Sequence, residues 1–270
     1  MFSPVHIESF RLPDLSTLTP LQPEGWSSLI PIFEFYTTSE YSFPIKVVAE
    51  SVTIGVGCAI CFEGSAWLAH IIVHPQYRRK GVGTMIVEEL LSQLEDRRID
   101  RVSLVATDDG HPLYRSFGFT EDSQYVFFKS ERLLKAADES RVVTAADSSD
   151  DSAILTLDRL VSGEARESLL KPHLDGALIC REAGPIGGLY LPTLGEGLIE
   201  ARSVVAGEEL MRHRLRTHNQ CILPADNVPA TTFLKENGYS EVRRAWRMWR
   251  GERPLWHPEW VFSRIAGNFG

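Results

Sequence analysis

The first half of the chain alternates short apolar runs with segments in which apolar residues recur at helical spacing. This pattern predicts a mixed α/β domain in which strands and helices follow in the order β-α-β-β-β-α-β-α-β. The predicted elements cover residues 5–10, 24–36, 45–50, 54–62, 67–73, 82–94, 101–106, 112–117 and 124–129.

The second half repeats this kind of alternation after a polar segment, 130–140, which is predicted to be a linker. Strands are expected at 141–145, 177–181, 187–191 and 220–223, and further β-structure at 243–250 and 260–265. Helices are expected at 151–160, 164–170, 196–217 with an interruption at Gly207, and in the segment from Asp226 or Asn227 to Gly238. Two domains follow, 1–132 and 140–270.

The segment 74–91 joins a buried strand to a long amphipathic helix through a basic, glycine-containing turn. The first turn of a helix leaves backbone N–H groups unpaired, and the helix dipole adds partial positive charge there. Glycines let the backbone approach a ligand closely, so this arrangement predicts a phosphate-binding loop. A surface turn with a solvated basic run is the alternative reading of the same residues.

Two blocks of this half resemble the GNAT superfamily of N-acyltransferases. The first is RxxGxG, from Arg78 to Gly83, which follows Val73-His74-Pro75. The second, 104–119, ends in the Tyr-x-x-x-Gly-Phe of Tyr114, Gly118 and Phe119. Their order and spacing match the family, which implies a mostly antiparallel mixed sheet flanked by helices.

The resemblance implies that acetyl-CoA is bound along one strand edge and in the loop that follows it. Backbone N–H groups near residues 71 and 72 would then polarise the thioester carbonyl. The residues assigned to this binding site are Ile71, Ile72, Val73, Arg78, Arg79, Lys80, Gly81, Val82, Gly83, Thr84 and Gly110.

Tyr114 is the catalytic candidate, because a phenol directed at the thioester sulfur can protonate the departing CoA thiolate. An aromatic side chain that only packs the short helix is the alternative. A general base is not identified. The two strand positions that carry an acid or histidine in some family members hold Ala69 and Trp67, and His70 and His74 lie off those positions. A water chain to solvent is also sufficient.

The second half resembles the first more loosely, and the chain as a whole resembles bacterial two-domain GNAT proteins. Residues 224–239 echo 106–119, and the ending at Gly251 is similar to that of such proteins. However, no RxxGxG precedes its helix, and Leu234 stands where the first half has Tyr114. A second acyl-CoA site is therefore not expected.

Composition narrows the function class further. The formal net charge of −8 in 270 residues argues against a nucleic-acid partner, since nucleic-acid binders carry a basic surplus. No apolar run approaches the ~20 residues needed to span a bilayer, and no secretory leader is recognised, so a cytoplasmic protein is expected. Cys58 and Cys61 form a CxxC within a predicted strand, where their side chains point to opposite faces, so no metal or disulfide is predicted.

The resulting hypothesis is an acetyl-CoA-dependent N-acetyltransferase that acts on a primary amine of a small molecule. A CoA-binding sensor or assembly module without turnover, and a protein lysine or N-terminal acetyltransferase, remain alternatives. The acceptor, the role of the second domain and the formation of a homodimer are left open.

Overall fold

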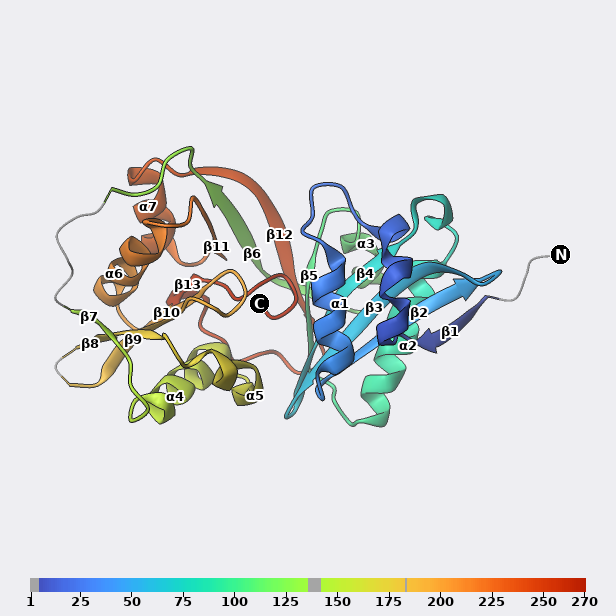
Figure 1. Ribbon diagram of the computed structural model, residues 1–270, viewed down its shortest axis with the longest axis horizontal. Helices are drawn as coiled ribbons and strands as arrows, with labels where there is room; N and C mark the ends of the chain where they lie inside the picture. The colour runs from blue at the N-terminus through green and yellow to red at the C-terminus, as the bar shows by residue number, and fades with distance from the viewer. Residues whose placement is uncertain (1–4, 136–141, 183) are drawn as a thin grey trace. The chain divides into compact units, whose positions relative to one another are not determined.

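A computed structural model describes residues 5–135, 142–182 and 184–270 (Figure 1). The chain forms two compact units. The first runs up to Leu104 and also includes Pro112–Phe119 and Trp249–Glu252, and the second contains Val105–His111, Thr120–Met248 and Arg253–Gly270. Contacts therefore group the strand after residue 119 with the second unit, and the predicted domain limits at 132 and 140 stay a prediction.

The first unit is built on a sheet in the strand order β1-β2-β3-β4-β5. Neighbouring strands are antiparallel except β4 and β5, which are parallel. The mixed α/β architecture with a mostly antiparallel sheet is thus confirmed. The strands are β1 His6–Ser9, β2 Ser42–Ala49, β3 Val52–Phe62, β4 Ser65–Val73 and β5 Val102–Ala106.

Helices cover both faces of these strands. A 3₁₀ segment, η1 Leu12–Leu21, and α1 Leu29–Thr38 lie on the near face in Figure 1, and α2 Val82–Asp96 lies on the far face. The short segment η2 Pro75–Tyr77 precedes α2 in the sequence, and α3 His111–Ser116 follows β5.

The predicted helix at 24–36 is wrong in its limits. The helix begins at Leu29, where the Ser28 side chain accepts a hydrogen bond from the N–H of Ile30 at 3.4 Å. Gly25, with φ of 75°, precedes it in a left-handed turn that a helix cannot include. The prediction placed the start of the helix too early, because Trp26 fits the helical period although it lies outside the helix.

Two glycines of β3 let α2 pack closely against the sheet. A Cβ placed on Gly57 would lie 2.5 Å from Cγ2 of Ile86, and one on Gly55 would lie 2.9 Å from Cγ1 of Val82. Contacts this short are not tolerated in a packed interior. The glycines therefore set the distance between α2 and the strands, and with it the position of the loop before α2.

The second unit contains strands β6 Thr120–Lys129, β11 Gln220–Pro224 and β12 Ser240–Arg250, in the order β12-β6-β11. A second sheet has the order β13-β10-β9-β8-β7. Its strands are β7 Val143–Ala145, β8 Leu178–Arg181, β9 Ile186–Leu191, β10 Leu198–Ala201 and β13 Val261–Ser263. The helices are α4 Asp151–Ser162, α5 Glu167–Leu170, α6 Val204–Leu215 and α7 Val228–Glu236, with 3₁₀ turns η3 Lys171–His173 and η4 Pro258–Trp260. The predicted linker, 130–140, lies partly outside the described residues.

The predicted long helix at 196–217 is wrong, because its first part is a strand. β10 pairs with β9 from Leu198 to Ala201, and Ser203 then caps α6 by accepting a hydrogen bond from the N–H of Ala206 at 3.1 Å. Gly207 lies inside α6 without breaking it, and a Cβ there would lie 2.3 Å from the Phe262 ring. Gly207 therefore allows α6 to pack closely against Phe262 and does not interrupt the helix.

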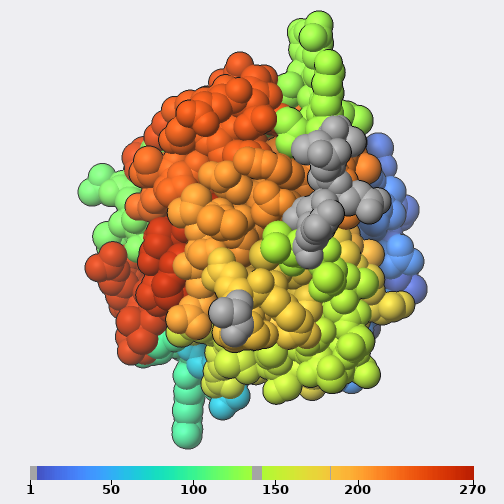
Figure 2. Space-filling view, turned by 90° about the vertical axis from the view of Figure 1, so that its left-hand side faces the viewer, coloured from blue at the N-terminus to red at the C-terminus, as the bar shows by residue number. Residues whose placement is uncertain are grey.

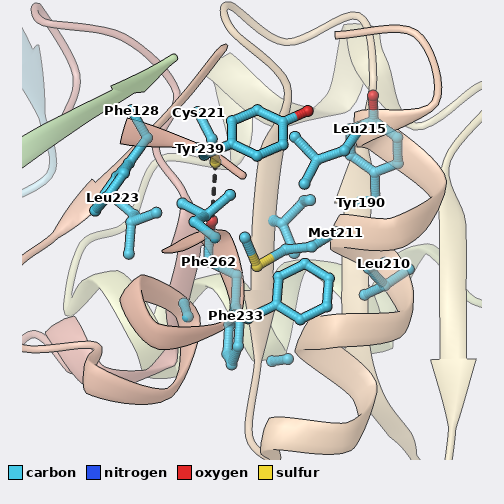
Figure 3. Packing of buried hydrophobic residues seen from close by; sticks show 14 of the residues in the cluster. Phe128, Tyr190, Leu210, Met211, Leu215, Cys221, Leu223, Phe233, Tyr239 and Phe262 are labelled. Atoms are coloured by element: carbon cyan, nitrogen blue, oxygen red, sulfur yellow. Dashed lines mark hydrogen bonds between the residues drawn. The ribbon is translucent and has the colours of Figure 1, made fainter. Parts of the chain in front are cut away.

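The core of the second unit lies between α6, α7 and the strands (Figure 3). Met211, Phe233 and Phe262 meet there, and the thiol of Cys221 donates to the carbonyl of Phe262 at 3.5 Å. In Figure 2, α6 and α7 (orange) lie next to each other on the surface of this unit, in agreement with their mutual packing. Within the described residues, no helix is long and apolar enough to cross a membrane.

Candidate functional site

The loop between β4 and α2 ends at a helix N-terminus, whose first backbone N–H groups have no partner within the helix. Arg79 and Gly81 both adopt left-handed φ values, 60° and 83°, and Gly81 is the N-cap of α2. The first turn of the helix is closed by the Met85 N–H, which donates to the Gly81 carbonyl at 3.0 Å. The N–H groups of residues 82–84 precede that bond, and a glycine N-cap offers no side chain to accept from them. The sequence prediction placed an anion cradle at this turn.

Three basic side chains surround this turn, and all three are exposed. Arg78 donates from Nε to the carbonyl of Val73 at 3.3 Å, which ties the loop back to the end of β4. Lys80 lies over the Tyr77 ring, with Nζ 5.3 Å from its centroid. Among the described residues, no carboxylate forms an ion pair with Arg78, Arg79 or Lys80, so their positive charge is available to an anion.

Among the described residues, no strand pairs with β4 on its β5 side just before the loop. β4 pairs with β5 at Ala66, Trp67 and Leu68, and this pairing ends at Leu68. On its other side β4 stays paired with β3 up to Val73, across a bulge near His70, whose φ is 49°. The pairing of these two parallel strands thus ends before the second half of β4.

The register decides which N–H groups of β4 point to this free edge. The His74 N–H donates to the Ile54 carbonyl of β3 at 2.9 Å, and residues of an antiparallel strand alternate in direction. Ile72, two residues before His74 and opposite Val56, therefore directs its N–H and carbonyl to β3. The N–H groups of Ile71 and Val73 face the free edge, which narrows the predicted thioester-polarising donor to Ile71.

His70 is held in an aromatic environment at the bulge. Its Nδ1 forms a hydrogen bond with the hydroxyl of Tyr36 at 2.8 Å, and the rings of Trp26 and Phe33 lie 6.1 and 6.2 Å away, centroid to centroid. Burial lowers the pKa of His70 to about 4. An imidazole that is neutral, hydrogen-bonded and lowered in pKa is a weak base, so His70 is a poor candidate for the general base.

Tyr114 lies on α3, in the same unit as the loop. Its side chain is 8% exposed, and its ring lies 6.0 Å from that of Phe119 in an edge-on arrangement. Burial raises the pKa of Tyr114 far above its usual range, so the phenol stays protonated over the working pH range of a protein. Leu113 brings this helix to the loop, because its Cδ2 lies 3.2 Å from where a Cβ of Gly83 would be.

Gly110 is the one predicted binding residue that falls outside the first unit. It belongs to Val105–His111, which groups with the second unit, and its N–H donates to the Thr107 carbonyl at 3.0 Å. Residues 71–73, 78–84 and Tyr114 lie in the first unit, and a role of Gly110 in binding stays a prediction. Sequence reasoning missed Gly55 and Gly57, although their alternation within one strand was a visible signal of close helix packing.

The cysteines form no disulfide and no metal site in the described parts of the chain. Cys58 is fully buried, and burial raises the pKa of Cys61 to about 11. Both thiols are therefore protonated at neutral pH and unreactive.

Residues 45–121 match the family model of the acetyltransferase (GNAT) domain. An uncharacterised N-acetyltransferase of Pyropia yezoensis is 28% identical over 78 residues, which are 28% of this chain and 45% of that protein. A similar protein of Porphyra purpurea is 30% identical over 61 residues, 23% of this chain and 34% of its own length. The chain thus spans less than half the length of these relatives.

Crystal structures resemble the whole chain. One from Pyrococcus horikoshii, provisionally named an acetyltransferase, has a TM-score of 0.83 and 22% identity and covers 100% of this chain and 97% of its own. A GCN5-related N-acetyltransferase of Sphaerobacter thermophilus has a TM-score of 0.67 and 14% identity over 93% of this chain and 98% of its own. Residues 45–121 of this chain thus match the GNAT family of acetyltransferase domains, and the chain shares its fold with these structures.

Proposed function

We propose that the chain is an acetyl-CoA-dependent N-acetyltransferase that acetylates a primary amine of a small molecule. One observation carries the proposal: the free edge of β4 leads directly into an α2 N-terminus with unpaired N–H groups, beside the helix that bears Tyr114. In the described residues these features belong to a single unit.

The donor groups of this unit suit acetyl-CoA. The pyrophosphate fits the N–H groups of residues 82–84, where the helix dipole favours negative charge and the basic side chains form no ion pair with a described carboxylate. The pantetheine amides fit the N–H groups of Ile71 and Val73, which extend the sheet as an added strand would. Bound acetyl-CoA supplies an activated acetyl group, whose carbonyl carbon an amine attacks with loss of the CoA thiol.

Backbone and side-chain groups of this unit supply the remaining functions. The N–H of Ile71 polarises the thioester carbonyl, and it needs no side-chain chemistry to do so. Tyr114 donates a hydrogen bond to the departing sulfur, and its raised pKa favours this hydrogen bond over complete transfer of its proton. Because His70 is engaged with Tyr36, the proton of the amine passes to water.

The experiment that tests this function is thiol release from acetyl-CoA, measured over a panel of small amines and of peptides with a free lysine or N-terminus. We expect amine-dependent release with at least one small amine and acetyl-amide formation by mass spectrometry. CoA binding with no release for any acceptor would instead support a sensor, and release with peptides alone would support protein acetylation.

A further inference from the structure

One face of the β12-β6-β11 strands in the second unit carries aromatic residues against which Trp256 and arginine side chains pack. Val126 and Phe128 of β6 point into the main core, whereas Tyr125 and Phe127, which alternate with them, form a separate small cluster with Ala245. We call the surface formed by Tyr125, Phe127, Arg243 and Arg264 the arginine face.

Two guanidinium groups share one aromatic ring on this face. The Cζ atom of Arg243 lies 3.6 Å from the Phe127 centroid, and that of Arg264 lies 4.8 Å from it. Cation–π contact stabilises each group singly, but the two positive charges repel each other. Partial burial lowers the pKa of Arg243, and the nearby charge of Arg264 lowers it further.

The carboxylates of the described residues do not balance these charges. Arg264 pairs with Glu196 through Nε at 3.2 Å and Nη2 at 3.0 Å. Its remaining nitrogen, Nη1, is buried and has no hydrogen-bond partner within the described chain. Arg243, which is exposed, forms no ion pair with any described carboxylate. Within the described residues, one positive charge therefore has no carboxylate to neutralise it, and one buried N–H donor has no acceptor.

An unsatisfied buried donor costs free energy, and so does a like-charge contact, unless something else compensates them. One group relieves both: an oxyanion that accepts from Arg264 and neutralises Arg243. The exposed Arg243 side chain has the rotamer freedom to move off the Phe127 ring and admit it.

We propose that the arginine face is a binding site for a small molecule that carries a carboxylate or a phosphate group. Arg243 and Arg264 hold the oxyanion, and the Phe127 ring contacts the apolar part of the ligand. Every residue that forms this site belongs to the second unit, whereas the β4–α2 loop belongs to the first.

The test titrates inorganic phosphate and, separately, benzoate into the full-length chain by calorimetry at constant ionic strength set with sodium chloride. The variant is Arg243→Gln, because Arg243 is exposed and the change leaves the core intact. Arg244→Gln is the matched control: Arg244 is adjacent and exposed but is directed to Glu241, with Nε 2.6 Å from Oε1.

We expect at least one of the two probes to bind, with affinity reduced about tenfold or more in Arg243→Gln and within twofold of wild type in Arg244→Gln. Preference for phosphate or for benzoate identifies the ligand group. Gly83→Asp, which blocks the loop of the first unit, should leave this binding unchanged.

Three results would overturn the proposal. They are no binding of either probe at tens of millimolar, equal affinity in wild type and Arg243→Gln, and binding that is lost in Gly83→Asp but kept in Arg243→Gln. The last result assigns the anion to the loop.

Discussion

Tyr114 is the residue on which the proposed chemistry depends most, and its hydroxyl can be removed alone. Tyr114→Phe keeps the ring that packs against Phe119, so the free energy of unfolding should change by less than ~1 kcal/mol. Turnover should fall by ~10²-fold, the scale for loss of one hydrogen-bond donor to a group that gains negative charge in the transition state, and acetyl-CoA affinity should stay within a few-fold.

Steady-state kinetics and thermal denaturation check this prediction, with Tyr77→Phe as control, since Tyr77 carries the same hydroxyl beside the loop. Because burial raises the pKa of Tyr114, its ionisation should not limit the wild-type rate below about pH 10. Normal turnover of a clearly destabilised Tyr114→Phe protein would make Tyr114 a packing residue only.

Glu200 is a second residue whose charge state the structure specifies. Arg166 donates from Nη2 to Asp158 at 2.7 Å and to Glu200 at 3.2 Å, and all three side chains are buried. Burial, and next the charge of Asp158, raise the pKa of Glu200 well above its usual range. We infer that Glu200 is protonated at neutral pH and that Asp158 is the main ion-pair partner of Arg166, with Glu164 farther away at 3.9 Å.

Glu200→Gln should therefore change the free energy of unfolding at pH 7 by no more than about 1 kcal/mol, or increase it. The folded state keeps a proton that the unfolded chain releases above about pH 4.3, so wild type loses stability as the pH rises through this window. Glu200→Gln has no such proton to keep, so its free energy of unfolding relative to that of wild type should increase from pH 5 to pH 8. Denaturant titrations at several pH values measure this difference.

Asp158→Asn serves as the control for the Glu200 prediction. Both Asp158 oxygens accept from Arg166, so we expect this change to cost ~3–5 kcal/mol at pH 7. A loss of that size in Glu200→Gln would mean that Glu200 is ionised and is a full partner of the arginine.

At the scale of elements, the packing of α2 on β3 connects stability to the loop. Gly57→Ala introduces a methyl group 2.5 Å from Ile86 Cγ2, and overpacking of this kind costs ~1–3 kcal/mol. The helix must move to accept it, so acetyl-CoA affinity should fall as well. Denaturant titration and calorimetry of Gly57→Ala measure the two effects.

A double-mutant cycle controls for a local strand effect. In an Ile86→Ala background the added methyl has room, so the same Gly57→Ala change should cost less there by about 1 kcal/mol. An equal loss of stability in both backgrounds would show that the added methyl group does not act through its contact with Ile86 of α2.

The elements of the fold were predictable wherever periodicity and end signals agreed, as in α2, β3 and α7. The prediction was wrong at 24–36 and 196–217, where apolar spacing continued through residues that tertiary structure uses differently. Leu198–Ala201 forms a strand because β9 pairs with it, and no local propensity encodes that partner. The position of the loop was predictable from its glycines, whereas the choice between the N–H groups of Ile71 and Ile72 required the register with β3.

At the scale of the whole molecule, the two units differ in what their sequences equip them to bind. Only the first unit carries the basic glycine turn before a helix, and Leu234 replaces the tyrosine in the second. We infer that one chain binds one acetyl-CoA, in the first unit. The arginine face gives the second unit a separate capacity for a small anion.

Calorimetric titration of acetyl-CoA into wild type, Gly83→Asp and Gly83→Asn tests the central claim most directly. Asp and Asn have the same shape, so both meet Leu113 alike, and only Asp adds a negative charge at the N-terminus of α2. We predict one site per chain in wild type, measurable binding in Gly83→Asn and none in Gly83→Asp. A stoichiometry of two, or equal affinity in Gly83→Asp and Gly83→Asn, would contradict the account.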